Sequence, residues 1–126
     1  MQRYPDLEIY AKDITFKDVD DWLKARFKQV ERKDTVKKKS EARSYWVVDG
    51  ADVIVFGNAL GNYSSIWFKH NNTPWDTDLD CARDAAKALN TQIRCSNSGW
   101  EEGQSADTQW WRVTEAEGEM LIEWDV

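Results

Sequence analysis

Few side chains in this sequence could carry out acid–base or nucleophilic chemistry. His70 is the only histidine, and Cys81 and Cys95 are the two cysteines. A histidine can act as a general base when a carboxylate such as Asp76 orients it, and a cysteine can be its nucleophile. Three aspartates precede Cys81, however, and nearby negative charge raises the pKa of a thiol. We therefore expect two buried thiols and a solvated or hydrogen-bonded His70, with a small enzyme using His70 as the third functional hypothesis.

The segment 76–87 has the beginning of a calcium-binding pattern without its end. Asp76, Asp78 and Asp80 alternate as in such a loop. The sixth and twelfth positions, however, hold Cys81 and Lys87 instead of the required Gly and Glu. The aspartates are expected on the exposed side of a helix, facing solvent or a basic partner. The sequence thus predicts no metal and no cofactor.

Two helices are predicted from capping signals and apolar spacing. Thr15 can cap the first helix with Asp18 at the capping-box position, and helical spacing of apolar residues continues to about residue 31. The basic residues that follow are expected in a loop. Thr73 can cap the second helix with Pro74 at its first position, which predicts a helix over 74–89.

Alternation of apolar and polar residues predicts the strands. They are expected at 7–12, 42–48, 52–57, 63–70, 91–95, 108–114 and 119–125. Asp49-Gly50 between two apolar runs is typical of a hairpin turn. The economical arrangement is α+β, with a single antiparallel sheet of about six or seven strands and two helices on one face, all in one domain over 1–126. The order of elements also suggests a doubled βαββ unit.

Successive strand residues point to opposite faces, so the pattern also predicts what each face of the sheet displays. The face under the helices is expected to hold Leu7, Ile9, Trp46, Val48, Ile66, Phe68, Ile93, Trp111, Val113, Met120, Ile122 and Trp124. The opposite face is expected to display Tyr10, Lys12, Arg43, Tyr45, Val47, Tyr63, Trp67, Lys69, Arg94, Trp110 and Arg112. Such an aromatic and cationic surface is unusual for a monomer that leaves it bare.

The charge is negative overall and unevenly distributed. The chain carries 23 acidic and 17 basic residues, for a net charge of -6. Residues 1–50 have a net charge of +2, and residues 51–126 have -8. This balance argues against a protein that binds nucleic acid mainly by neutralising phosphates, and a mean hydropathy of -0.74 argues against a membrane protein. The first residues contain no apolar stretch typical of a signal peptide. The sequence therefore predicts a cytoplasmic location and two cysteines with reduced thiols.

The C-terminal part of the chain combines acidic and aromatic residues. Residues 101–126 carry eight acidic side chains and one basic side chain. An acidic rim around exposed aromatic rings is suited to another protein with a basic surface. The leading hypothesis is a non-catalytic binding module that docks onto a partner as an inhibitor, antitoxin or immunity protein does. Its predicted interface residues are Trp100, Glu101, Glu102, Trp110, Glu115 and Glu117.

Besides a partner protein, two other occupants of the opposite sheet face stay open, and the long loops of the chain itself are a further possible cover of that face. One is nucleic acid, bound by the basic segment 32–43 and by aromatic rings on which bases stack. The residues predicted for that alternative are Lys37, Lys38, Lys39, Arg43, Tyr45 and Trp67. The other is a second copy of the chain, which would form a homodimer through the sheet face.

Overall fold

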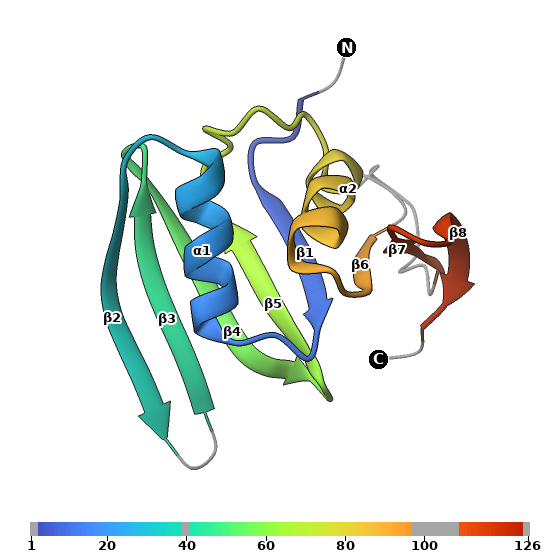
Figure 1. Cartoon of the computed structure of the whole chain (residues 1–126), viewed down its shortest axis with the longest axis horizontal. Helices are drawn as coiled ribbons and strands as arrows, with labels where there is room; N and C mark the ends of the chain where they lie inside the picture. The colour runs from blue at the N-terminus through green and yellow to red at the C-terminus, as the bar shows by residue number, and fades with distance from the viewer. Residues whose placement is uncertain (1–2, 39–40, 97–108, 125–126) are drawn as a thin grey trace, which may run out of the picture.

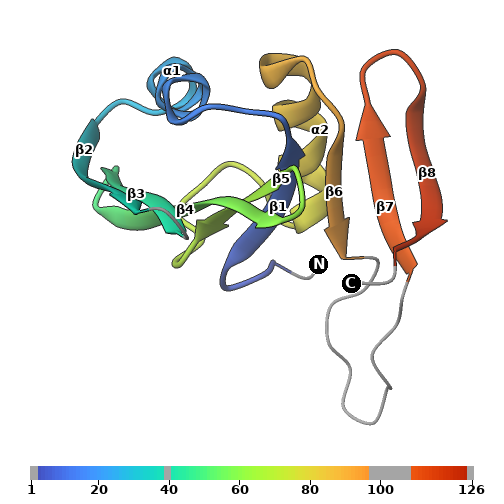
Figure 2. The same ribbon diagram turned by 90° about the horizontal axis from the view of Figure 1, so that it is seen from below.

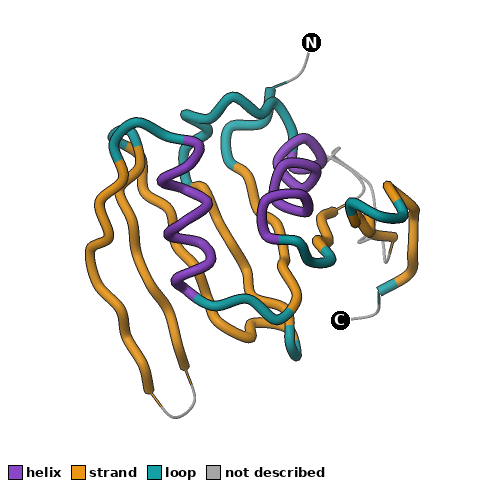
Figure 3. Tube along the Cα trace, in the orientation of Figure 1, coloured by secondary structure: helices purple, strands orange, loops and turns teal. Residues whose placement is uncertain are grey.

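Eight strands and two helices make up the described part of the chain (Figures 1 and 3). The computed structural model describes residues 3–38, 41–96 and 109–124, and of residues 34–38 and 41 it describes only the backbone. The elements are β1 (Leu7–Lys12), α1 (Phe16–Arg26), β2 (Val30–Lys38), β3 (Glu41–Val48), β4 (Ala51–Leu60), β5 (Tyr63–Phe68), α2 (Asp78–Leu89), β6 (Ile93–Ser96), β7 (Gln109–Thr114) and β8 (Gly118–Glu123).

All eight strands belong to one antiparallel sheet. Their order is β2-β3-β4-β5-β1-β6-β7-β8, so β5 and β1 lie at the centre and β2 and β8 at the edges. Both helices lie on the same face of the sheet (Figure 2). The prediction of an α+β fold with two helices on one face of a single antiparallel sheet is confirmed, with eight strands in place of six or seven.

The additional strand is β2, where the sequence predicts the end of a helix and a basic loop. The capping box at Thr15 and Asp18 is confirmed, but α1 ends at Arg26. Phe27 continues the helical spacing of buried residues although it lies beyond the last helical residue. Val30 then pairs with Val48 of β3, so pairing with a neighbouring strand overrides the local helical pattern.

The start of α2 also differs from the prediction. Thr77, not Thr73, caps the helix, and its side chain accepts a hydrogen bond from the backbone N–H of Asp80. Thr73 is instead buried in the preceding loop, where its hydroxyl accepts from the backbone N–H of Trp75 at 3.1 Å. The Arg3 guanidinium donates to the Trp75 carbonyl at 3.2 Å. These contacts hold the loop and direct Trp75 into the core.

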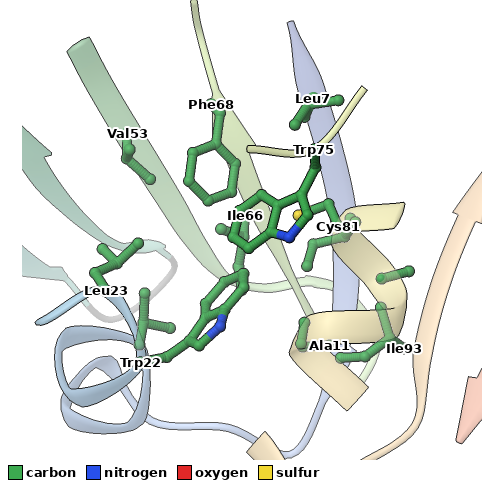
Figure 4. Packing of buried hydrophobic residues seen from close by; sticks show 14 of the residues in the cluster. Leu7, Ala11, Trp22, Leu23, Val53, Ile66, Phe68, Trp75, Cys81 and Ile93 are labelled. Atoms are coloured by element: carbon green, nitrogen blue, oxygen red, sulfur yellow. The ribbon is translucent and has the colours of Figure 1, made fainter. Parts of the chain in front are cut away.

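Aromatic rings fill the space between the helices and the sheet (Figure 4). Trp22 of α1 stacks on Trp75, with ring centroids 5.5 Å apart and planes at 22°. The ring of Phe68 meets both edge to face, at 6.0 Å from Trp22 and 5.8 Å from Trp75. Leu23 beside them is fully buried. Each such ring pair contributes about 0.5–1.5 kcal/mol beyond the burial of its area.

One strand presents the opposite face from the one predicted. The expectation that Met120, Ile122 and Trp124 face the helices is wrong. Trp111, on the helix side, pairs with Leu121, whereas Trp110 pairs with Ile122, and paired residues share a face. The cause is the turn, because Thr114 pairs with Gly118 across three residues, where the sequence suggests four. Changing a turn by one residue inverts the faces of the following strand.

The order of elements along the chain repeats, whereas their order in space does not. Each half reads strand, helix and three strands. In the first half the chain goes from α1 to the edge strand β2 and returns toward the centre. In the second half it goes from α2 to the inner strand β6 and moves outward to β8. The two halves therefore share a sequence of elements but not one topology.

Candidate functional site

The residues with catalytic potential do not meet in the structure. His70 is exposed in the bend after β5, whereas Cys81 and Cys95 are fully buried and form no disulfide. Burial raises the pKa of both thiols above its ordinary value. The carboxylate of Asp76 pairs with Arg3, with Oδ1 and Nη1 2.8 Å apart. Among the described side chains, His70 thus forms no hydrogen bond with a nucleophile that it could activate or with a carboxylate that could orient it.

The three aspartates of the calcium-like pattern also have separate roles. Asp76 pairs with Arg3, and Asp80 pairs with Arg83 at 2.9 Å. Asp78 accepts a hydrogen bond from the backbone N–H of Glu8 at 3.1 Å. No group of three His, Cys, Asp or Glu side chains within the described ranges is arranged to hold a metal ion.

The predicted acidic interface is only partly within the described residues. Trp100, Glu101 and Glu102 lie outside them. Trp110 lies on the face of the sheet opposite to the helices, at the beginning of β7. Glu115 and Glu117 are exposed in the turn at the other end of the β7–β8 hairpin, where Glu117 pairs with Arg112 at 2.7 Å. The structure therefore does not bring these two glutamates to Trp110.

The residues of the nucleic-acid alternative are likewise divided. Lys37 and Lys38 belong to β2, and Lys39 lies outside the described residues. Tyr45 pairs with Ile54 and Ile54 with Trp67, so these three side chains form one row across β3, β4 and β5. Arg43 lies on the same face of β3, with its guanidinium carbon 6.0 Å from the Tyr45 ring centroid.

We call the side of the sheet opposite to α1 and α2 the helix-free face. Its apolar and aromatic side chains come from six strands and the residue after β8, and most of them are half-buried. They are Tyr45, Val47, Ile54, Phe56, Tyr63, Trp67, Tyr10, Trp110, Met120, Ile122 and Trp124. The sequence-based placement of aromatic residues on this face is confirmed for Tyr10, Tyr45, Tyr63, Trp67 and Trp110.

Four of these rings form an aromatic cluster, made of Tyr10, Tyr63, Trp110 and Trp124. The ring of Trp124 lies 5.0 Å from those of Tyr63 and Trp110 and 5.8 Å from that of Tyr10. The guanidinium carbon of Arg94 lies 4.6 Å from the ring centroids of both Tyr63 and Trp124. These contacts attach the residue that follows β8 to the middle of the sheet. Cation–π geometry at Arg94 adds to that attachment.

Three carboxylates lie near one another where β1 and α2 begin, and we call Asp6, Glu8 and Asp78 the carboxylate cluster. The indole N–H of Trp67 donates to Asp6 at 2.9 Å. The hydroxyl of Tyr10 donates to Glu8 at 3.2 Å. None of the three carboxylates forms an ion pair with a cation in the described part of the chain. The cluster is therefore a group of carboxylates without an ion pair among the described residues, next to the half-buried rings of Tyr10 and Trp67. The ammonium of Lys69 lies on the same face, 5.7 Å from the centroid of the Trp67 ring.

The pKa shifts at this place have the same origin. Burial raises the pKa of Asp78 to about 7, and the charges of Asp6 and Glu8 act in the same direction. Burial and then the charge of Glu8 raise the pKa of Tyr10 to about 12. A carboxyl group whose pKa is raised by burial and by neighbouring charges, as that of Asp78 is, marks a candidate functional position.

Sequence reasoning missed the carboxylate cluster, although part of the signal is present. Glu8 lies between Leu7 and Ile9 in a strand whose alternation predicts its faces correctly, so its place on the helix-free face follows from parity. Asp78 is different. The described residues of β6 pair with β1 at Tyr10 and Ala11 and do not extend the pairing to Glu8. The backbone N–H of Glu8 is therefore available to donate a hydrogen bond to Asp78, at the start of α2. No local pattern encodes that gap.

No described helix is long and apolar enough to span a lipid bilayer. No protein-family model matches the chain, and no similar curated protein or solved structure was found.

Proposed function

We propose that this chain is a cytoplasmic protein-binding module that docks its helix-free face onto a partner with a basic surface. It has no catalysis of its own in this proposal and acts as an inhibitor, antitoxin or immunity protein does. The observation that carries the proposal is the position of Trp67 and Tyr10, two half-buried side chains directly hydrogen-bonded to the carboxylates Asp6 and Glu8.

Aromatic rings and carboxylates without ion pairs contribute differently to such an interface. Tyr and Trp bury a large area with few rotatable bonds, and they are enriched among the residues that dominate binding energies. The carboxylate cluster would attract a lysine or arginine side chain and orient it, and the net charge of -6 favours encounter with a basic protein. The proposed contact is thus centred on β1 and β5 rather than on the turn with Glu115 and Glu117.

Nucleic acid is the less favoured occupant of this face. Arg43 and Lys69 provide cations, and Tyr45 and Trp67 provide rings on which bases could stack. Asp6 and Glu8, however, stand next to Trp67 and form no ion pair among the described residues, so they would repel a phosphate backbone even with the Lys69 ammonium 5.7 Å from the Trp67 ring centroid. An enzyme using His70 has less support, because the imidazole is exposed and makes none of the contacts that a general base needs with the side chains that the structure describes.

Capture of partners from a lysate of the source organism tests the proposal. The tagged wild-type chain is compared with Glu8→Lys and with Asp21→Lys, which makes the same charge change at an exposed position of α1. We expect one protein to be retained after nuclease treatment by the wild type and Asp21→Lys, and to be lost with Glu8→Lys.

Each other outcome contradicts the proposal in its own way. Retention that nuclease abolishes would favour nucleic acid. Equal retention by Glu8→Lys would exclude the helix-free face as the docking surface. A concentration-dependent dimer in sedimentation of the purified chain, weakened by Glu8→Lys, would assign the face to a second copy.

A further inference from the structure

The edge strand β8 carries the two most exposed large apolar side chains of the described residues. Met120 is 39% exposed and Leu121 is 47% exposed. Because they are consecutive in a strand, they lie on opposite faces, with Met120 on the helix-free side and Leu121 on the helix side. In the described part of the chain β8 pairs only with β7. Both faces of this edge therefore offer apolar surface.

Within the described ranges no strand pairs with the outer edge of the β8 backbone. Alternate residues of an edge strand direct their N–H and C=O groups away from the only neighbouring strand. Proteins usually protect such an edge with a bulge, a proline or lysine residues. The opposite edge, β2, has an irregularity between Arg32 and Thr35. By contrast, β8 pairs regularly with β7 from Gly118 to Glu123 and contains neither proline nor lysine.

The charges that flank the apolar centre decide what can pair there. Glu119 and Glu123 lie on either side of Met120, Leu121 and Ile122. In an antiparallel pair of two β8 strands that aligns these apolar centres, each Glu119 would face Glu123 of the other copy. Like charges directly opposite each other destabilise a strand pair. A second copy is therefore disfavoured, and a strand with cations at those positions is favoured, above all opposite Glu123, because Glu119 already pairs with Arg83.

We propose that an extended segment of a partner protein, apolar at its centre and carrying Lys or Arg two residues to either side, adds to β8 as a ninth strand. Main-chain hydrogen bonds would supply affinity, and Glu123, with a smaller contribution from the Arg83-paired Glu119, would select the charge. Glu123 has no ion pair among the described side chains, whereas Glu119 shares the Arg83 guanidinium at 2.9 Å. This inference goes beyond the docking of the helix-free face and does not depend on it.

The test uses a capped heptapeptide, Thr-Lys-Thr-Val-Thr-Lys-Thr, titrated into the isotope-labelled chain and followed by amide NMR shifts. Two further peptides carry methyl groups on every second backbone nitrogen. In one peptide the methylated nitrogens belong to the odd-numbered residues, and in the other they belong to the even-numbered residues; we call these the two frames. A strand pairs through one edge only, so one frame blocks pairing and the other leaves it intact. We expect binding with a dissociation constant on the order of 1 mM, with shifts centred on β8.

We expect the blocking frame to bind about tenfold or more weakly than the other. Equal binding of both frames would overturn the proposal, because it would mean side-chain contact without strand pairing. Shifts centred away from β8, or no shifts at about ten times the expected dissociation constant, would also overturn it. So would a dimer of the free chain that Leu121→Thr abolishes, since the occupant would then be a second copy.

Discussion

Replacement of Asp78 by asparagine is expected to stabilise the protein at neutral and higher pH. The carboxyl of Asp78 is partly buried at the first residue of α2, next to the charges of Asp6 and Glu8. Its pKa is raised from 3.8 to about 7, so its charged form is disfavoured in the folded state. An asparagine oxygen can still accept the hydrogen bond that Asp78 receives from the N–H of Glu8.

The sign and size follow from proton linkage. Between pH 4 and pH 7 the folded chain holds a proton on Asp78 that the unfolded chain has released, so stability falls as the pH rises through this window. The loss is at most about 1.4 kcal/mol for each pH unit, or roughly 4 kcal/mol in total. Asp78 keeps some contact with water and lies at the positive end of α2, so we expect a gain of about 1–3 kcal/mol from Asp78→Asn at pH 8.

Urea unfolding of the wild type and the variant at pH 5 and pH 8 measures this effect. Asp80→Asn is the matched control, because Asp80 lies in the same first turn of α2 but forms an ion pair with Arg83. That variant is expected to lower the free energy of unfolding by less than about 1 kcal/mol. The reasoning is refuted if Asp78→Asn destabilises the protein at pH 8, or if its effect is the same at both pH values.

Three further predictions concern stability and are checked by urea unfolding. Thr15→Ala removes the side chain that accepts from the N–H of Asp18 and is expected to lower the free energy of unfolding by about 1 kcal/mol; an unchanged midpoint would argue against the cap. Leu23→Ala empties a fully buried site and should cost about 2–5 kcal/mol, so a loss below about 1 kcal/mol would contradict the packing of α1. Trp124→Ala removes the ring stacked on Arg94 and is expected to cost about 1–3 kcal/mol, whereas no change would mean that this residue does not attach to the sheet.

Local signals predicted most of the fold where short-range chemistry is decisive. The hairpin at Asp49-Gly50 follows from residues that adopt positive φ, here +46° and +84°. The cap at Thr15 and the alternation in β1 likewise depend on neighbouring residues alone. Sequence-based predictions were wrong where long-range pairing or the length of a turn determines the structure. Strand β2 pairs with β3 despite its basic composition, and the turn before β8 determines which face each β8 side chain occupies.

The candidate site could be predicted only in part for a related reason. Strand parity placed Tyr10, Trp67 and Trp110 on one face correctly. It did not predict that Trp124 folds back over that face, since this contact is long-range and follows the end of a strand. Nor did it predict the approach of Asp78 to Glu8, which depends on where two strands stop pairing.

The central claim, that the helix-free face contacts a partner protein, is tested most directly by oxidative footprinting of tryptophans in the captured complex. Trp110 and Trp111 are adjacent and both half-buried, but they lie on opposite faces of β7. We expect the oxidation of Trp67 and Trp110 to fall severalfold on binding while that of Trp111 stays unchanged. Protection of Trp111 with Trp67 and Trp110 still open to oxidation would place the partner on the other face and contradict the account.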